Sequence, residues 1–306
     1  MSSQKEIKNR ISSVRSTQKI TSAMRMVSSA NLHRTQTLSQ NFIRYSDELR
    51  SVVEALCPGA WTEENVALDG LVQGQAVAVV PVSSNSGLCG AFNSNIAKAT
   101  IALLADCRKK GIDAYLFPIG KKITNELKKQ SLPHLNLQYA KANERSDGAT
   151  MFDSVRQLVA DLQQMYGKGE IQQVVLLYHH FQSMGKQIVT TKVLGMSVPF
   201  THPQKEEVQS DSPKKISLEG TDYLTEPTPQ ELVAILHPKM LNAEVYSVLL
   251  DALTSEHAAR MLAMQTADDN ANELLQELTL LYNKTRQQAI TNELIDIMGG
   301  KTSQTS

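Results

Sequence analysis

Apolar residues recur at steps of three and four near both ends of the chain, a spacing that is typical of helices in a coiled coil. Glycine and proline, the main helix breakers, are absent between Met1 and Pro58 and again between Pro238 and Gly299. Each stretch can therefore form one continuous helix. The expected N-terminal seam is Ile7, Ile11, Val14, Gln18, Thr21, Met24 and Val27. The expected C-terminal seam is Leu241, Val245, Val248, Ala252, Ala259, Leu262, Thr266, Leu274, Leu278 and Leu281.

Polar residues interrupt these seams, at Gln18, Thr21, Thr266, Asp269 and Gln288. Much of the remaining seam is alanine or methionine. One narrow apolar stripe with polar gaps predicts two helices that pack on each other and stay exposed on their other faces. A protein partner could cover those faces.

Between the terminal helices, short apolar runs alternate with amphipathic stretches. Strands are expected at residues 75–83, 113–118, 171–180 and 187–198, and helices at residues 93–110, 121–130 and 150–166. This alternation predicts an α/β layer with some parallel strands.

The pattern divides the chain into four expected segments. They are an N-terminal helix over 1–57, an α/β domain over 70–200, a polar loop over 201–222, and a C-terminal segment over 223–306 that contains the second long helix.

The 306-residue chain has a formal charge of zero, which argues against wholesale binding to nucleic acid. The charge is uneven, however, because residues 1–36 carry Lys or Arg at seven positions against one acidic residue, Glu6. The basic helix lacks the bulky apolar face of an interfacial membrane helix. It is either a solvated face or a surface for an acidic protein partner. The alternative function is a coiled-coil adaptor, or a nucleic-acid-binding protein that uses this helix.

The cysteines and the apolar runs bear on the compartment. Cys57, Cys89 and Cys107 form an odd set without a Cys-x-x-Cys pair, which indicates a reducing compartment. The first residues, MSSQKEIKNR, are polar and predict no signal peptide. The longest apolar run, near Val77, is too short to span a bilayer. We expect a protein that is soluble, or peripheral at most.

The turn SSNSGLCGAFN, residues 83–93, is the most conspicuous candidate for chemistry, because it follows a predicted strand. It lacks the G-x-x-x-x-G-K-[ST] pattern of a phosphate loop, and no lysine follows before Lys98. Cys89 would need a nearby base to become a nucleophile. We expect a tight turn with a small buried thiol.

The adjacent pair His179 and His180 could suggest a metal site or a base. On a strand the two rings point to opposite faces, and no cluster of Asp, Glu or Cys completes a coordination set. We expect structural histidines. The residues alone therefore predict no catalytic group, no metal and no cofactor.

Four stretches resemble the gamma subunit family of F-type ATP synthases. Residues 5–32, KEIKNRISSVRSTQKITSAMRMVSSANL, resemble the N-terminal helix of that family, and residues 83–93 resemble the loop after its first strand. DYLTEPTPQEL, residues 222–232, resembles the segment before the C-terminal helix, and residues 255–297 resemble that helix. The stretches occur in the family's order, so the resemblance covers the whole chain.

The resemblance implies an α/β fold with a long antiparallel coiled coil of the N- and C-terminal helices and a Rossmann-like α/β domain. It implies a non-catalytic central-stalk rotor of a proton-translocating ATP synthase, which couples c-ring rotation to ATP synthesis or hydrolysis in the beta subunits. The implied partners are the alpha3beta3 ring, the epsilon subunit and the c-ring, with no nucleic acid and no cofactor. The implied location is the cytoplasmic face of the bacterial plasma membrane, which the protein contacts only through the complex.

The resemblance also implies two sets of partner-binding residues. Those that match contacts with the alpha3beta3 ring are Met24, Arg25, Met26, Arg260, Arg286, Gln287 and Thr291. Those that match the foot on the c-ring and the epsilon subunit are Tyr223 and Glu226.

The loop after the first strand departs from the family. Asn85 and Ser86 occupy positions where the family usually has Asp followed by Arg or Lys. Because any ion pair of that Asp and Arg is lost, we expect the loop to serve folding only.

Overall fold

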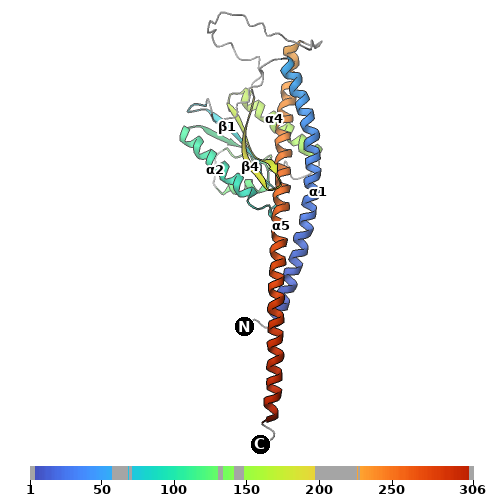
Figure 1. The fold of residues 1–306 in the computed structure, drawn as a ribbon. Coiled ribbons are helices and arrows are strands. Elements are labelled where there is room, and N and C mark those ends of the chain that lie inside the picture. The colour runs from blue at the N-terminus through green and yellow to red at the C-terminus, as the bar shows by residue number, and fades with distance from the viewer. Residues whose placement is uncertain are drawn as a thin grey trace, which may run out of the picture. The chain divides into compact units, whose positions relative to one another are not determined.

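The computed structural model describes residues 4–56, 68, 71–129, 134–140, 148–196, 226 and 228–302 (Figure 1). Two long helices, α1 (Gln4–Leu56) and α5 (Pro229–Thr302), confirm the predicted terminal helices. The elements between them are β1 (Ala76–Pro81), α2 (Phe92–Lys110), β2 (Asp113–Leu116), α3 (Lys121–Lys128), α4 (Gly148–Gly167), β3 (Gln173–Ser183) and β4 (Lys186–Leu194). Their order confirms the predicted alternation of strands and helices.

The chain forms two compact units, and both long helices contribute to each. The helix-pair unit comprises Met1–Leu32 and His257–Ser306, and the α/β unit comprises His33–Glu256. The four segments predicted from the sequence remain a prediction; the loop over 201–222 lies outside the described residues.

The sheet of the α/β unit has the strand order β2-β1-β3-β4. β1 pairs in parallel with both β2 and β3, whereas β3 and β4 form an antiparallel hairpin. All six residues of β1 are buried, as expected for a central strand covered on both faces. The sheet is therefore mixed, and the predicted parallel pairing is confirmed.

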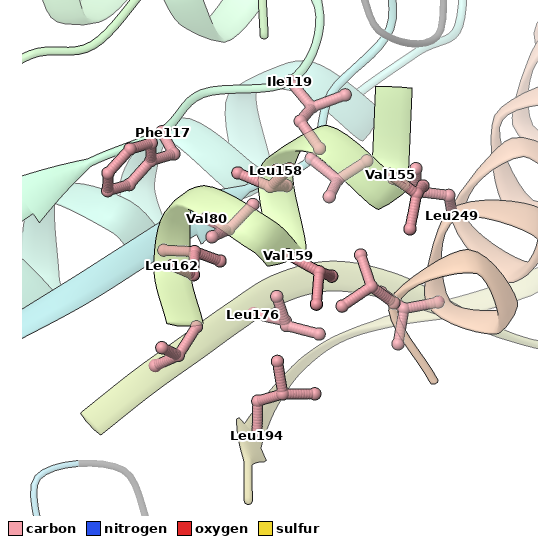
Figure 2. Close-up of a cluster of buried hydrophobic side chains, with 14 of the residues drawn as sticks. Val80, Phe117, Ile119, Val155, Leu158, Val159, Leu162, Leu176, Leu194 and Leu249 are labelled. Carbon is pink, nitrogen blue, oxygen red and sulfur yellow. The ribbon is translucent and has the colours of Figure 1, made fainter. Parts of the chain in front are cut away.

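The larger apolar core lies between one face of the sheet and the helices α4 and α5 (Figure 2). Leu158 and Leu162 of α4 are essentially unexposed and pack with Val80 of β1 and Leu176 of β3. Leu249 of α5 joins the same cluster. The opposite face of the sheet packs on α2 and α3 through a second cluster, which includes Val77, Ile96, Leu104, Ile123 and Leu127.

The loops after β1 and β2 run side by side and hold the start of α3. The Ser83 amide donates to the Ile119 carbonyl at 2.8 Å, and the Ile123 amide donates to Ser83 Oγ at 3.0 Å. The Lys121 amide donates to Asn85 Oδ1 at 3.0 Å. Asn85 thus caps an amide at the start of α3, so the loop has the folding role that was expected of it.

α5 extends beyond both ends of the stretch between Pro238 and Gly299 that was predicted to be helical. Pro238 lies inside the helix, and Pro229 is its first residue. Thr228 and Glu231 form a capping box: the Thr228 amide donates to Glu231 Oε2 at 3.3 Å, and the Glu231 amide donates to Thr228 Oγ1 at 3.4 Å. The sequence TPQE, residues 228–231, already contains the capping-box pattern. Its proline also indicates a helix start, because proline is preferred at the first helical position.

Candidate partner-binding surfaces

In the helix-pair unit, α1 and α5 run antiparallel. Gln18 Nε2 donates to Asn272 Oδ1 at 2.5 Å, and Arg25 contacts Gln265 and Asp268, so rising numbers on α1 meet falling numbers on α5. Figure 1 shows the two helices side by side over this part of the chain. The antiparallel pairing that the resemblance implied is therefore present.

The predicted α1 seam is right at its first five positions, which are buried or half-buried, and wrong at its last two. Met24 and Val27 are exposed, whereas Arg25 is half-buried and Ser28 is buried. Ser28 fits there because its hydroxyl donates to the Met24 carbonyl of its own helix at 2.8 Å. An arginine can occupy a seam position because the methylene groups of its side chain pack while its guanidinium contacts polar groups.

The predicted C-terminal seam is only partly right within this unit, where Ala259 and Leu278 are half-buried as predicted. Leu262, Leu274 and Leu281 are more than a third exposed, and Thr266, Asp269 and Gln288 are exposed rather than in the seam. One stripe of buried or half-buried positions runs through Ala258, Met261, Met264, Asp268, Ala271, Leu275, Leu278 and Tyr282. The true stripe keeps the spacing of three and four but includes a charged residue, which a purely apolar template passes over.

A polar layer crosses the seam at Arg25. Its Nη1 donates to Gln265 Oε1 and lies 4.0 Å from Asp268 Oδ2. The Asp268 side chain is only 13% exposed, and its Oδ1 has no hydrogen-bond partner among the described residues. Gln265 also donates to the exposed Asp269 at 3.1 Å. Polar groups at seam positions fix the register of paired helices, because a shifted register leaves them unsatisfied.

We expect Arg25→Met to lower the free energy of unfolding of the isolated chain by about 1–2 kcal/mol, since it leaves the Asp268 carboxylate without its cation. Urea unfolding of the purified chain measures this loss. The double variant with Asp268→Ala should recover most of it. A stable Arg25→Met chain that nevertheless impairs an assembled complex would assign Arg25 to a partner instead.

The two neighbours of Arg25 point away from the seam. Met24 is 40% exposed and Met26 is 64% exposed. Exposed methionines are adaptable contact residues, because the thioether chain is flexible and polarisable. The predicted segment 24–26 thus contains one residue held by α5 and two that are open to a partner.

The predicted α5 residues form two separate bands. Arg260 is half-buried near the start of the unit's α5 portion, whereas Arg286, Gln287 and Thr291 are exposed toward the end. At a rise of 1.5 Å per residue, Arg260 and Gln287 lie roughly 40 Å apart along the helix. Thr291 shares the face of Gln287 and donates to its carbonyl at 2.9 Å. The structure therefore does not bring these residues into one site.

The predicted foot is only partly described. Glu226 is exposed. Tyr223 lies outside the described residues.

Sequence reasoning missed a set of exposed apolar residues in the last third of α5. Leu280 is 71% exposed, and Ile290, Leu294 and Ile295 are also more than a third exposed. Residues of this kind on one helix segment indicate a surface that another protein covers. The recurrence of leucine and isoleucine in this segment was the available signal, but in the sequence it cannot be distinguished from a seam between the two helices.

The turn with Cys89 is built as predicted. Cys89 is buried, and its Sγ accepts a hydrogen bond from Asn93 Nδ2 at 3.1 Å. Asn93 Oδ1 accepts from the Ser84 amide at 3.1 Å and from Ser84 Oγ at 2.9 Å. The prediction of a buried thiol is confirmed. The polar groups around Cys89 are hydrogen-bonded to one another, and these bonds close the turn.

His179 and His180 point to opposite faces, as predicted. His179 is buried, stacks on Phe92 and donates from Nε2 to the Phe92 carbonyl at 2.8 Å. Burial lowers the pKa of His179. His180 instead donates from Nδ1 to Asp251 Oδ2 at 2.6 Å. Across the described residues, no three His, Cys, Asp or Glu side chains gather where they could hold a metal ion.

Comparison with known proteins places the chain in a class. A family model described as ATP synthase matches residues 3–303. The chain is 42% identical over 306 residues to the ATP synthase gamma chain of Parabacteroides distasonis, with 98% of each chain covered. It is 38% identical to the ATP synthase gamma chain of Flavobacterium johnsoniae, again with 98% of each chain covered. The chain therefore belongs to the ATP synthase gamma chain family.

Solved structures agree on the fold. A chain of the Euglena gracilis mitochondrial ATP synthase (OSCP/F1/c-ring) superposes with a TM-score of 0.64 at 17% identity, covering 98% of this chain and 94% of that one. A chain of the Tetrahymena thermophila mitochondrial ATP synthase (central stalk/c-ring) gives a TM-score of 0.52 at 20% identity, covering 81% and 99%. These likenesses support the predicted combination of paired long helices with an α/β domain.

Proposed function

We infer that this chain is the central-stalk rotor subunit of an F-type ATP synthase. The observation that carries this inference is the match to ATP synthase gamma chains over 98% of the chain. The chain is non-catalytic and couples rotation of a c-ring to ATP synthesis or hydrolysis in beta subunits, with protons as the translocated ion. Its partners are the alpha3beta3 ring, the epsilon subunit and the c-ring.

The architecture suits a rotor, because a shaft acts on the catalytic sites only through contacts that differ among them. The helix pair is held together by a narrow seam and leaves its other faces open. A free-standing adaptor or a nucleic-acid-binding protein is not favoured, since the match spans the whole length of gamma chains.

The ring contacts are proposed to come from residues on both helices. Met24 and Met26 offer exposed apolar surface on α1. Arg286, Gln287 and Thr291 offer polar surface on α5, interleaved with the exposed leucines and isoleucines of its last third. Arg25 and Arg260 complete the proposed set, with Arg25 tied to α5 as well. Glu226 and Tyr223 are proposed to contact the c-ring and the epsilon subunit.

We place the protein at the cytoplasmic face of a bacterial plasma membrane, held there by the complex. Bacterial gamma chains are among its relatives. Within the described residues, no helix combines the length and the apolarity needed to cross a membrane.

The test is assembly and turnover in membranes. The tagged chain should co-purify with three alpha and three beta subunits per copy and with ATPase activity. Arg260→Ala combined with Gln287→Ala should lower ATP synthesis and hydrolysis at least about fivefold, because the two hydrogen bonds to the ring that we propose for these side chains together contribute about 1–3 kcal/mol.

The matched control is Gln164→Ala, at an exposed position of α4 away from the proposed contacts. It should leave turnover unchanged. Recovery of the chain alone or with nucleic acid would refute the rotor function. Normal turnover in the double variant would remove only Arg260 and Gln287 from the ring contacts.

A further inference from the structure

β3 extends beyond its neighbour β1 and leaves part of one edge without a strand partner. β1 pairs only with residues 173–177 of β3, which continues to Ser183. The last ladder bond on this edge runs from the Val82 amide to the Leu177 carbonyl at 2.8 Å. Backbone groups of alternate residues point to the same edge of a strand, so those of His179 and Phe181 follow on this edge. Buried backbone groups require partners.

α5 supplies these partners from its side chains. Asp251 Oδ1 accepts from the Phe181 amide at 2.9 Å, and Ser255 Oγ donates to the His179 carbonyl at 2.9 Å. Asp251 and Ser255 are four residues apart and therefore share one face of α5. Ser255 is completely buried. Two side chains of a helix thus take the place that β1 would have filled along β3.

His180 fixes the Asp251 carboxylate from the other side. Its Nδ1 donates to Asp251 Oδ2 at 2.6 Å while Oδ1 accepts the Phe181 amide. Both carboxylate oxygens are therefore engaged, which holds the side chain in one orientation. We call Asp251, Ser255, His180 and the backbone of His179 and Phe181 the β3–α5 clamp.

The clamp differs in kind from the apolar packing around it. Val245, Val248, Leu249 and Ala252 also hold α5 on the sheet. Apolar burial is non-directional, so such a surface resists separation more than it resists turning or sliding. Hydrogen bonds to backbone groups weaken steeply when their geometry changes. The clamp therefore opposes rotation of α5 about its own axis on the sheet.

We propose that Asp251 and Ser255 are positioning residues that lock α5 to β3 and so pass torque between the α/β unit and the shaft. The proposal rests on the rotor function inferred above. The clamp lies within the last two turns of α5 before the α/β unit ends at Glu256. Ser255 thus holds α5 to the sheet one residue before that end.

The test uses assembled ATP synthase in inverted membrane vesicles, with ATP hydrolysis and ATP-driven proton uptake measured on the same sample. With Asp251→Ala plus Ser255→Ala, proton uptake per ATP hydrolysed should fall at least about fivefold, the factor that the net contribution of one hydrogen bond represents. Hydrolysis itself should stay close to that of the unchanged complex. Asp251→Asn should largely restore coupling, because its amide oxygen can still accept the Phe181 amide.

Ser255→Ala keeps the test decisive where the double variant does not assemble, because it removes one bond and leaves Asp251 in place. A merely structural clamp would reduce the amount of complex but not the ratio of uptake to hydrolysis. An unchanged ratio in Ser255→Ala and in any assembled double variant would overturn the proposal. Failure of the unchanged chain to enter the complex would instead refute the rotor function, so the two failures are distinct.

Discussion

Gly120→Ala is expected to destabilise the α/β unit by more than about 3 kcal/mol. Gly120 has φ +102° and ψ 138°, a backbone conformation that is essentially restricted to glycine. A Cβ at this position would lie 2.2 Å from the Ser83 carbonyl oxygen. That oxygen belongs to the backbone of the neighbouring loop, so no side-chain rotation relieves the clash.

The loops cannot simply separate to make room. Ser83 is bonded to Ile119 and to the Ile123 amide, and the Gly120 amide donates to the Ala140 carbonyl at 3.1 Å. Moving the loops apart would break these bonds and unseat α3 from its apolar cluster. The cost is therefore the backbone strain plus several buried hydrogen bonds.

Urea unfolding of the full chain measures the loss, and hydrogen exchange of the β1 and β2 amides locates it in the sheet. Gly167→Ala is the matched control, because nothing lies within 4 Å of a Cβ built there and its φ is not positive. It should leave stability unchanged or raise it by up to about 1 kcal/mol. Equal stability of the two variants would show that the loops are not held together as described.

Much of the fold could be predicted because its signals are local. The absence of glycine and proline marked both long helices, and the alternation of apolar runs marked each strand to within a few residues. The burial of Cys89 could be predicted from the sequence of its loop. The opposite orientations of His179 and His180 could be predicted from strand geometry. Each of these inferences needs only neighbouring residues.

What could not be predicted depends on contacts between distant segments. The seam of the helix pair passes through Arg25 and Asp268, because the cation and the carboxylate pair across the interface. An apolar template therefore selected Met24 and Leu262 instead. The role of Asp251 depends on where β1 ends beside β3, which no pattern within α5 reveals. The contacts of the proposed partner-binding residues depend on other chains.

Acidification from pH 7 to pH 4 should lower the stability of the chain, and His257→Gln should remove about 3 kcal/mol of that fall. Burial, with a smaller contribution from the Arg260 cation, lowers the pKa of His257 from 6.5 to about 4. Its Nδ1 has no hydrogen-bond partner among the described residues. The folded chain therefore keeps this ring neutral.

The direction of this change of stability with pH depends on whether the folded or the unfolded chain takes up the proton. Below pH 6.5 the unfolded chain protonates His257 while the folded chain does not, so the proton favours unfolding. Above pH 6.5 the protonation of His257 does not lower the free energy of unfolding. That free energy falls as the pH drops toward 4, and below about pH 4 this group lowers it no further. Burial also lowers the pKa of His179, which adds a fall in the same direction.

Urea unfolding at closely spaced pH values gives the slope of the free energy of unfolding against pH, for the unchanged chain and for His257→Gln. Between pH 6 and pH 4.5 the slope of the variant should be smaller by up to about 1.4 kcal/mol per pH unit, which corresponds to one proton. Above pH 7 the two curves should run parallel, which serves as the internal control. The residual slope of the variant belongs to His179 and to the other groups that titrate in this range. Identical slopes would mean that His257 takes up its proton without unfolding, so the ring would have to reach solvent within the folded chain.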